Sequence, residues 1–153
     1  MRRVWKQIID MPPVWLLFFL LMGYGQSRLF NPGAYDGPFS DMVGWLLIGL
    51  GIAMEVLSFF AFRRHKTTIV PRNTPAAMIT SGPFRISRNP IYLANCIILS
   101  GAVLVFGSVI GFALVPAYMA LITLRFIRHE EAGLEAEFGA AFRQYRQRTR
   151  RWL

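Results

Sequence analysis

Residues 91–127 read IYLANCIILSGAVLVFGSVIGFALVPAYMALITLRFI, an apolar stretch in which Arg125 is the one charged residue. As a single α-helix this stretch would extend roughly 55 Å at 1.5 Å per residue. That length is too great for one crossing of a hydrocarbon core about 30 Å thick and fits two shorter crossings. A break near Phe106-Gly107-Ser108 would therefore make it a helical hairpin, with Pro116 as a tolerable kink in the second arm.

Two further apolar segments precede the hairpin, and the four predicted spans share an apolar composition suited to membrane crossing. They cover residues 13–25, 42–62, 91–106 and 109–127. We therefore expect an all-α integral membrane helical bundle of about four transmembrane helices. A chain of 153 residues fits one domain over residues 1–153. A polar loop over 63–90 separates the second and third spans, and an amphipathic helix is expected over 128–149.

The chain carries 17 Lys and Arg against 8 Asp and Glu, a formal net charge of +9. Most basic residues flank apolar segments, which favours anchoring at a membrane surface over nucleic-acid binding. Arg28 alone lies on the side of the membrane opposite to the others. The positive-inside rule therefore places both termini, the loop over 63–90 and the C-terminal helix in the cytoplasm. We expect a multi-pass protein of the cell (inner) membrane, with the lipid bilayer as its partner and no nucleic-acid partner. The sequence does not predict its oligomeric state.

Metal chemistry has few candidate ligands in this sequence. Cys96 is the one cysteine, which excludes an internal disulfide and a cysteine-based metal cluster. The two histidines, His65 and His129, are isolated from each other in the sequence. We therefore expect no protein-bound metal.

A polar cluster, GPFRISRNPIY over residues 82–92, stands at the start of the third span. A residue before proline avoids the helical region, and proline suits the first helical position. Asn89 is therefore expected to be extended and to cap a helix that starts at Pro90. The exposed N–H groups of that helix, together with the forked donors of Arg85 and Arg88, would attract a carboxylate or a phosphate.

Tyr92 and Asn95 lie three residues apart, so both would carry polar groups along one helix face into the membrane edge. Simpler explanations exist for the parts of this cluster. The arginines could contact lipid phosphates, and Tyr92 could belong to an interfacial aromatic belt. The whole string together favours a binding site over anchoring alone.

A second cluster follows the fourth span, where Glu130 and Glu131 begin the C-terminal helix. Adjacent helical residues point about 100° apart, so the two glutamates cannot share a face. The apolar face of this helix consists of residues at helical spacing: Leu134, Phe138, Phe142 and Tyr145. Glu131 aligns with that face, where it could accept hydrogen bonds from ribose hydroxyls or an amine. An ion pair with Arg88 or Arg128 is the structural alternative.

Glu55 lies deep in the second predicted span. An unpaired charge there is costly, so this carboxyl group must be neutral, paired or directed at a polar cavity. Glu55 and Asn95 are therefore candidate substrate-site residues.

These motifs resemble those of the isoprenylcysteine carboxyl methyltransferase and phospholipid methyltransferase superfamily of small membrane enzymes. The similarity runs from about Thr67 to Leu153, more than half of the chain, and order and spacing agree as well as identity. The matching segments are TTIVP (67–71), TSGPFR (80–85), RNPIY (88–92), EEAGL (130–134), Phe138-Gly139, Tyr145 and Arg151-Trp152-Leu153.

The resemblance implies S-adenosylmethionine as cofactor, held on the cytoplasmic side between the third span, the fourth span and the C-terminal helix. It places cofactor-binding residues in both clusters: Gly82, Arg85, Arg88, Asn89, Pro90, Tyr92, Glu130 and Glu131. Arg88 and Glu131 are the candidate catalytic residues, while the choice of Glu130 or Glu131 as cofactor contact stays open. Isoprenylcysteine enzymes usually carry Arg-His-Pro where this chain has Arg88-Asn89-Pro90. The role of that histidine does not transfer to Asn89, so the acceptor also stays open.

The function expected from the resemblance is methyl transfer to a lipophilic or membrane-associated O, N or S nucleophile. The open acceptors are a phospholipid amine, a prenyl-like carboxylate, a quinone-type hydroxyl and a small thiol. One alternative is a non-catalytic accessory or lipid-binding protein that retains the same framework. Another is a relative of the sterol reductases, which use a nicotinamide cofactor, although the small size of the chain counts against it.

Overall fold

The computed structural model describes residues 11–65 and 77–153, and within these ranges every named element is helical. The elements follow one another in this order: α2 (Pro12–Leu29), α3 (Pro38–Arg64), η1 (Gly82–Arg85), α4 (Pro90–Val105), η2 (Ile110–Ala113), α5 (Leu114–Ile122), η3 (Thr123–Ile127) and α6 (Arg128–Arg148). The predicted all-α class is therefore confirmed for the described part of the chain. The motif over 67–71 lies outside the described residues.

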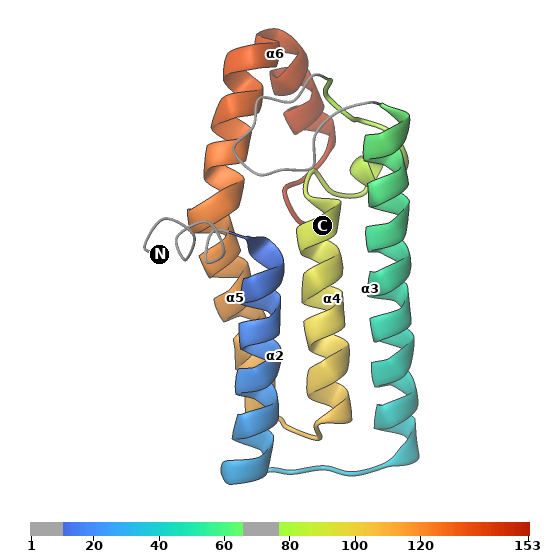
Figure 1. The fold of residues 1–153 in the computed structure, drawn as a ribbon, viewed down its shortest axis with the longest axis vertical. Coiled ribbons are helices and arrows are strands. Elements are labelled where there is room, and N and C mark those ends of the chain that lie inside the picture. The colour runs from blue at the N-terminus through green and yellow to red at the C-terminus, as the bar shows by residue number, and fades with distance from the viewer. Residues whose placement is uncertain (1–10, 66–76) are drawn as a thin grey trace, which may run out of the picture.

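Helices α2, α3, α4 and α5 run side by side along the long axis of the molecule (Figure 1). The backbones of α3 and α4 approach closely because glycines stand at their contact. A Cβ atom at Gly51 would lie 2.9 Å from the carbonyl oxygen of Ala94, and one at Gly101 would lie 2.5 Å from that of Gly44. Small residues permit such an approach between membrane helices. This contact fixes the position of α4 along the axis of α3, so that the start of α4 lies beside the end of α3.

The turn between α4 and α5 confirms the break that the length of the apolar stretch predicts. Helix α4 ends at Val105, and Gly107 adopts a φ of 63° that suits a residue without a side chain. The carbonyl oxygen of Gly107 accepts hydrogen bonds from the backbone N–H of Tyr35 at 3.1 Å and from Asn31 Nδ2 at 3.1 Å. The loop between α2 and α3 is thereby attached to the closed end of the hairpin.

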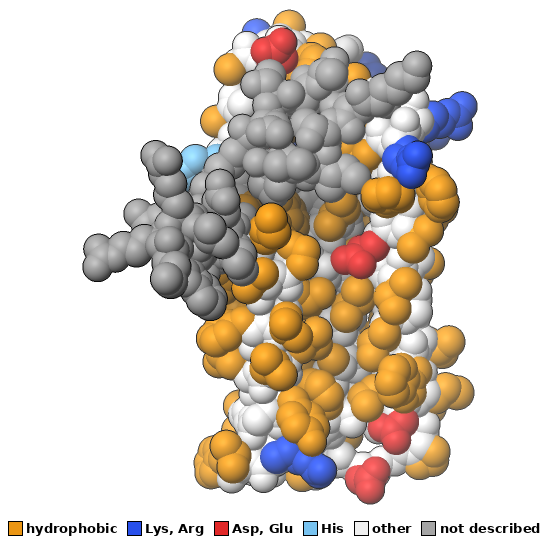
Figure 2. Space-filling model, in the orientation of Figure 1, with side chains coloured by type: hydrophobic (Ala, Val, Ile, Leu, Met, Phe, Trp, Pro, Cys, Tyr) orange, Lys and Arg blue, Asp and Glu red, His pale blue; other side chains and the backbone are white. Residues whose placement is uncertain are grey.

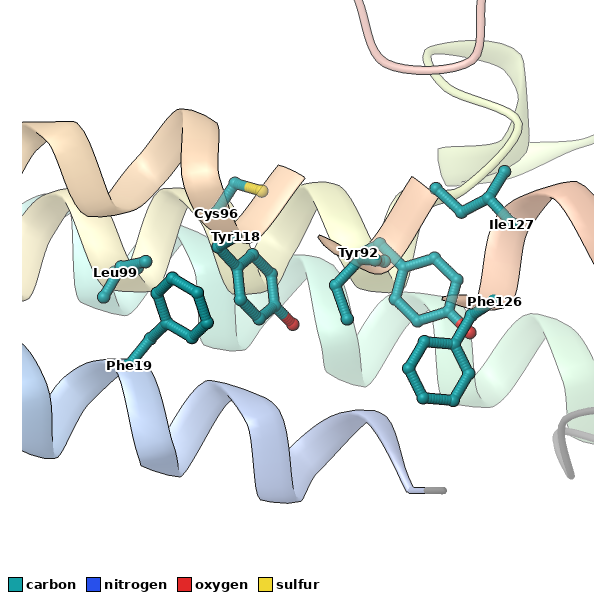
Figure 3. Packing of buried hydrophobic residues seen from close by; sticks show 8 residues of the cluster. Phe19, Tyr92, Cys96, Leu99, Tyr118, Phe126 and Ile127 are labelled. Atoms are coloured by element: carbon teal, nitrogen blue, oxygen red, sulfur yellow. The ribbon is translucent and has the colours of Figure 1, made fainter. Parts of the chain in front are cut away.

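The buried core lies where α2, α4 and α5 meet. Tyr118 is fully buried and packs edge to face on Phe19, with ring centroids 5.3 Å apart. Tyr92 stands beside Phe126 further along α4, with ring centroids 6.4 Å apart. Figure 3 shows these aromatic side chains filling the space between the helices. The core therefore extends to the first turn of α4, where Tyr92 brings a polar group to its edge.

Helix α6 departs from the single amphipathic helix predicted over 128–149. At Gly139 the backbone has a φ of 47° and a ψ of −114°, so the helical path is interrupted there. The chain then turns back toward the start of α4 (Figure 1). Phe142 and Tyr145 are buried, whereas Leu134 and Phe138 are only partly covered. The prediction of one continuous apolar face is wrong, because glycine admits a left-handed turn that the spacing of apolar residues does not reveal.

The outer surface of the bundle is apolar. Among the described residues, two helical stretches are long and apolar enough to cross a membrane, Pro38–Arg64 and the continuous Ile110–Arg148, while α4 is apolar but shorter. Large side chains such as Trp45, Leu46 and Leu50 project from α3 and are exposed. Figure 2 shows hydrophobic side chains over most of one face and basic side chains toward its two ends. Such a surface fits a membrane protein, because lipid can cover it.

The close contact of α3 and α4 predicts different costs for two neighbouring substitutions. Gly51→Ala places a methyl group against Ile98 and the backbone of α4, whereas Gly49→Ala meets nothing within 4 Å. We expect Gly51→Ala to destabilise the protein by about 1–3 kcal/mol through overpacking. Gly49→Ala should leave it unchanged or slightly more stable, since alanine is the better helix former. Thermal unfolding in detergent measures both, and equal effects would show that the contact is not tight.

Candidate functional site

The end of the chain is fastened to the start of α4. We name residues 149–151 the C-terminal strap. The backbone N–H of Arg88 donates to the carbonyl oxygen of Arg150 at 2.9 Å. Ser87 Oγ and Asn89 Nδ2 donate to the carbonyl oxygen of Arg151 at 2.9 and 3.1 Å. The two clusters that lie about forty positions apart in the sequence therefore meet at one end of the bundle (Figure 1).

Asn89 occupies the predicted N-cap position, but its side chain does not cap α4. Its φ of −128° and ψ of 60° lie outside the helical region, as the following proline favours, but the backbone is not extended as predicted. Pro90 is the first residue of the helix. The amide side chain instead donates to the strap at Arg151. The predicted capping bond is wrong, because a carbonyl group from a distant segment takes the place of the local partner. The helix start therefore keeps first-turn N–H groups that this side chain does not satisfy.

The strap completes an ion cluster that consists of Arg88, Glu131 and Arg151. Arg88 donates to Glu131 Oε1 from Nε at 3.2 Å and from Nη2 at 2.7 Å. Arg151 donates from Nε to Oε1 at 3.1 Å and from Nη2 to Oε2 at 2.5 Å. The side chains of Arg88 and Glu131 are only 9% and 12% exposed, whereas that of Arg151 is 36% exposed. The ion pair considered for Glu131 and Arg88 is thus present, and a second arginine joins it.

The ion cluster sets the charge of Glu131. Burial alone would raise the pKa of this carboxyl group, but hydrogen bonds from Arg151 and Arg88 outweigh burial and hold the pKa below its usual value of 4.5. The hydrogen bond to Glu131 in turn raises the pKa of Arg151. Two guanidinium groups face one carboxylate, so the ion cluster keeps a net positive charge.

Arg88 also holds the strap through its remaining donor group. Its Nη1 donates to the carbonyl oxygen of Thr149 at 2.7 Å and to that of Arg146 at 3.3 Å. Nearby, the hydroxyl group of Tyr145 donates to the carbonyl oxygen of Phe84 at 2.6 Å and attaches α6 to η1. Burial raises the pKa of Tyr145 to about 12, which keeps this hydroxyl a donor. The side chain of Arg88 therefore connects the start of α4 with the first and last turns of α6 and with the strap.

Glu130 lies in a different setting from its neighbour. Its Oε1 accepts a hydrogen bond from the hydroxyl group of Tyr92 at 2.7 Å. Burial raises the pKa of Glu130, the hydrogen bond from Tyr92 partly opposes that rise, and the nearby Glu131 adds to it. The prediction that the two glutamates point to different surroundings is met by this geometry. Glu131 is directed to arginines, and Glu130 to a buried phenol.

The two candidate substrate residues lie deeper in the bundle. Asn95 is buried, and its Nδ2 donates to the hydroxyl group of Tyr118 at 3.1 Å. Glu55 lines an open cavity of about 340 Å³ with Val56, Phe59 and Phe60 of α3 and Ile91 of α4. Glu55 is therefore not part of the ion cluster. It lines a cavity to which α4 contributes Ile91, the residue before Tyr92.

Gly82 and Arg85 do not join the ion cluster. Gly82 begins η1 with a φ of 60°, is exposed, and has open space where a side chain would be. Arg85 ends η1 and is exposed as well. The residues of the site that sequence reasoning missed are Ser87, Thr149, Arg151 and Tyr118. The sequence motif Arg151-Trp152-Leu153 gives Arg151 no role, and no spacing rule connects it with a glutamate twenty positions earlier.

Comparison with known proteins gives one result. A family model described as phospholipid methyltransferase matches residues 39–141. Neither the curated proteins nor the solved structures provide a match. The matched range includes Arg88, Tyr92, Glu130 and Glu131 and ends before the strap.

The ion cluster predicts a pH-dependent contribution of Glu131 to stability. Glu131→Gln should lower the free energy of unfolding by about 2 kcal/mol at pH 7, less than for a fully buried pair because Arg151 is partly exposed. The folded pKa is depressed, so the contribution is complete above pH 4.5 and is lost as the pH falls through the folded pKa. Thermal unfolding in detergent should show the two proteins converging below pH 4.5. Glu137→Gln, at an exposed position of α6, is the control, and a pH-independent difference would contradict this account.

Proposed function

The chain belongs to the phospholipid methyltransferase family, and on that premise we propose that it transfers a methyl group from S-adenosylmethionine to a lipophilic or membrane-associated acceptor. The observation that carries this proposal is the meeting of the ion cluster with the Tyr92–Glu130 pair at one end of an apolar bundle. Both lie on residues inside the matched range, with Arg151 added by the strap. The family description favours a phospholipid as the acceptor, with a carboxylate, a hydroxyl and a thiol as the other classes.

The residues at this end of the bundle fit the proposed cofactor by their chemistry. S-adenosylmethionine carries a carboxylate, an ammonium group, ribose hydroxyls and a sulfonium cation. The net positive charge of the ion cluster and the uncapped start of α4 suit the carboxylate. Glu130 and Glu131 offer acceptors for hydroxyl and ammonium groups. When bound, the cofactor supplies an electrophilic methyl group.

In this proposal the residues of the chain bind and orient. Arg88 and Glu131 hold the polar part of the cofactor, and Asn89, Pro90 and Tyr92 line its pocket. Gly82, with open space at its Cα, allows the backbone to approach the cofactor, and Arg85 adds positive charge from η1. Alignment of the two reactants accounts for most of the rate in such a transfer. The buried aromatic groups around Tyr92 exclude water from the reacting atoms.

We also propose the membrane arrangement that this chemistry needs. Four helical spans, formed by α2, α3, α4 and the stretch from η2 through η3, cross the cell (inner) membrane. Both termini and α6 lie in the cytoplasm. Most basic residues precede the first span, lie between the second and third spans, or follow the fourth span, and these segments share one side of the membrane. The cofactor then enters from the cytoplasm, and the acceptor enters from the bilayer through the cavity beside Glu55. Asn95, with Tyr118, provides polar groups further along that path.

Methyl transfer is tested directly with detergent-purified protein, methyl-labelled S-adenosylmethionine and a total lipid extract. We expect the label to appear in a lipid. Arg88→Lys should weaken cofactor binding about tenfold, because lysine keeps the charge but loses the forked donors. Arg143→Lys, at an exposed position of α6, should bind normally. Absence of cofactor binding by the unmodified protein would leave the accessory or lipid-binding role as the better account.

Glu55 gives a separate test of the acceptor route. Glu55→Leu should raise the KM for the labelled lipid about tenfold, since an acceptor hydrogen-bonded to the carboxyl group loses that partner. The dissociation constant of S-adenosylmethionine should not change, because Glu55 lies outside the ion cluster. Isothermal titration and initial rates measure the two quantities. A change in cofactor binding, with no change in KM, would place the acceptor elsewhere.

A further inference from the structure

One carboxyl group opens onto an apolar cavity at the contact of α3 and α4. The cavity, of about 340 Å³, is lined by Glu55, Val56, Phe59 and Phe60 of α3 and by Ile91 of α4. Among these lining residues Glu55 alone has a polar side chain. The rings of Phe59 and Phe60 stand edge to face, with centroids 6.1 Å apart. The cavity is therefore an apolar recess with a single side chain that forms hydrogen bonds.

The carboxyl group of Glu55 has neither a cation nor a hydrogen-bond donor as partner among the described residues. Arg63 follows eight positions later on α3, about 12 Å along the helix, and lies over Phe59 with 5.9 Å from its Cζ to the ring centroid. Tyr118 of α5 interacts with Glu55 electrostatically, and its hydroxyl group accepts a hydrogen bond from Asn95. An unpaired carboxylate inside a membrane is costly, so this carboxyl group is neutral when the cavity holds no ligand.

A neutral carboxyl group in an apolar recess selects among lipid headgroups. It offers an O–H donor and a carbonyl acceptor, which match the acceptor and the donor of a hydroxyl group. A phosphate or a carboxylate would meet no cation in the lining and would lose its hydration without compensation. An ammonium group would require the ionised form of Glu55, and the desolvation of both charges offsets the attraction of such a buried pair. The lining therefore favours an uncharged headgroup.

Depth also distinguishes a hydroxyl lipid from a phospholipid. Arg63 and Arg64 end α3 and, in the proposed membrane arrangement, stand at the level of the lipid phosphates. Glu55 lies about 12 Å further into the hydrocarbon core. A phospholipid bound by its phosphate at Arg63 would place an acyl chain beside Glu55 and leave the carboxyl group without a partner. A hydroxyl group on an apolar body reaches this depth at a much smaller desolvation cost than a charged group.

We propose that the cavity binds a lipid whose polar group is an uncharged hydroxyl, hydrogen-bonded to the carboxyl group of Glu55. Phe59 and Phe60 cover its apolar body. This inference rests on the proposed function in one respect, since the bound lipid is then the methyl acceptor in place of a phospholipid. The hydroxyl oxygen forms the bond to the methyl carbon, the methyl–sulfur bond breaks with its electron pair left on sulfur, and the hydroxyl proton passes to water.

Matched amphiphiles test the site by binding alone. Pentadecylphenol carries the hydroxyl group, pentadecylanisole has a methyl ether in its place, and pentadecylamine and a lysophosphatidylethanolamine carry charged headgroups. Native mass spectrometry of the detergent-purified protein, without cofactor, measures how much of each ligand is retained. We expect the unmodified protein to retain pentadecylphenol about tenfold more strongly than each of the others, roughly the effect of one hydrogen bond.

Substitutions in the lining locate that preference. Glu55→Leu should lower the retention of pentadecylphenol to that of pentadecylanisole, because the hydrogen-bond partner is gone while an apolar side chain remains in the cavity. Val56→Trp should lower the retention of both ligands, since the larger side chain fills the cavity. Glu137→Leu makes the same chemical change at an exposed position of α6 outside the cavity and should behave as the unmodified protein.

Three binding results would overturn the site. They are equal retention of pentadecylphenol and pentadecylanisole, undiminished retention of pentadecylphenol by Glu55→Leu, and stronger retention of the amine or the lysophospholipid. Methyl-labelled S-adenosylmethionine then tests the acceptor. Label in pentadecylphenol supports the inference, and label in the lysophospholipid alone contradicts it. If the protein binds no cofactor, the proposed function fails, whereas the hydroxyl site is still decided by the binding measured without cofactor.

Discussion

The pairing of Glu131 with two arginines is the interaction on which the functional end of the molecule depends. Arg88 directly precedes Asn89, the N-cap of α4, and Arg151 belongs to the strap. Next to the strap, Trp152 packs against the hydrophobic core. The largely buried carboxylate of Glu131 joins the two segments through four charge-assisted hydrogen bonds. Removal of one member would leave charge without its partner, which is why such a cluster acts as a unit.

This cluster is placed by the apolar bundle beneath it. The glycines at the contact of α3 and α4 set how far the start of α4 reaches, and the core around Tyr118 joins α2 and α5 to the same helix. Tyr92 lies at the boundary, with its ring in the core and its hydroxyl group on Glu130. Apolar packing thus determines where the ion cluster and the Tyr92–Glu130 pair lie, and the polar groups of these residues determine what the site can bind.

Sequence reasoning predicts the features that follow from local rules. The length of the apolar stretch predicts the hairpin break near Gly107, and the proline rule predicts that Asn89 lies outside the helical region and that the helix starts at Pro90. Charge alone offers Glu131 an ion pair with Arg88 or with Arg128, and the structure contains the pair with Arg88. The turn at Gly139, the strap and the role of Arg151 depend on contacts between distant segments. Periodicity and capping rules relate residues that are only a few positions apart in the sequence. They carry no information about contacts between distant segments.

The separation of the two glutamates is a consequence of that turn. Because Gly139 directs α6 back toward α4, Arg151 reaches Glu131 and, with Arg88, satisfies its charge. Glu130 points about 100° away and is left with a neutral phenol as its partner among the described residues. A single helix over 128–149 would have carried the strap away from both carboxyl groups. The kink at one glycine therefore gives adjacent residues of the same type opposite shifts of the pKa.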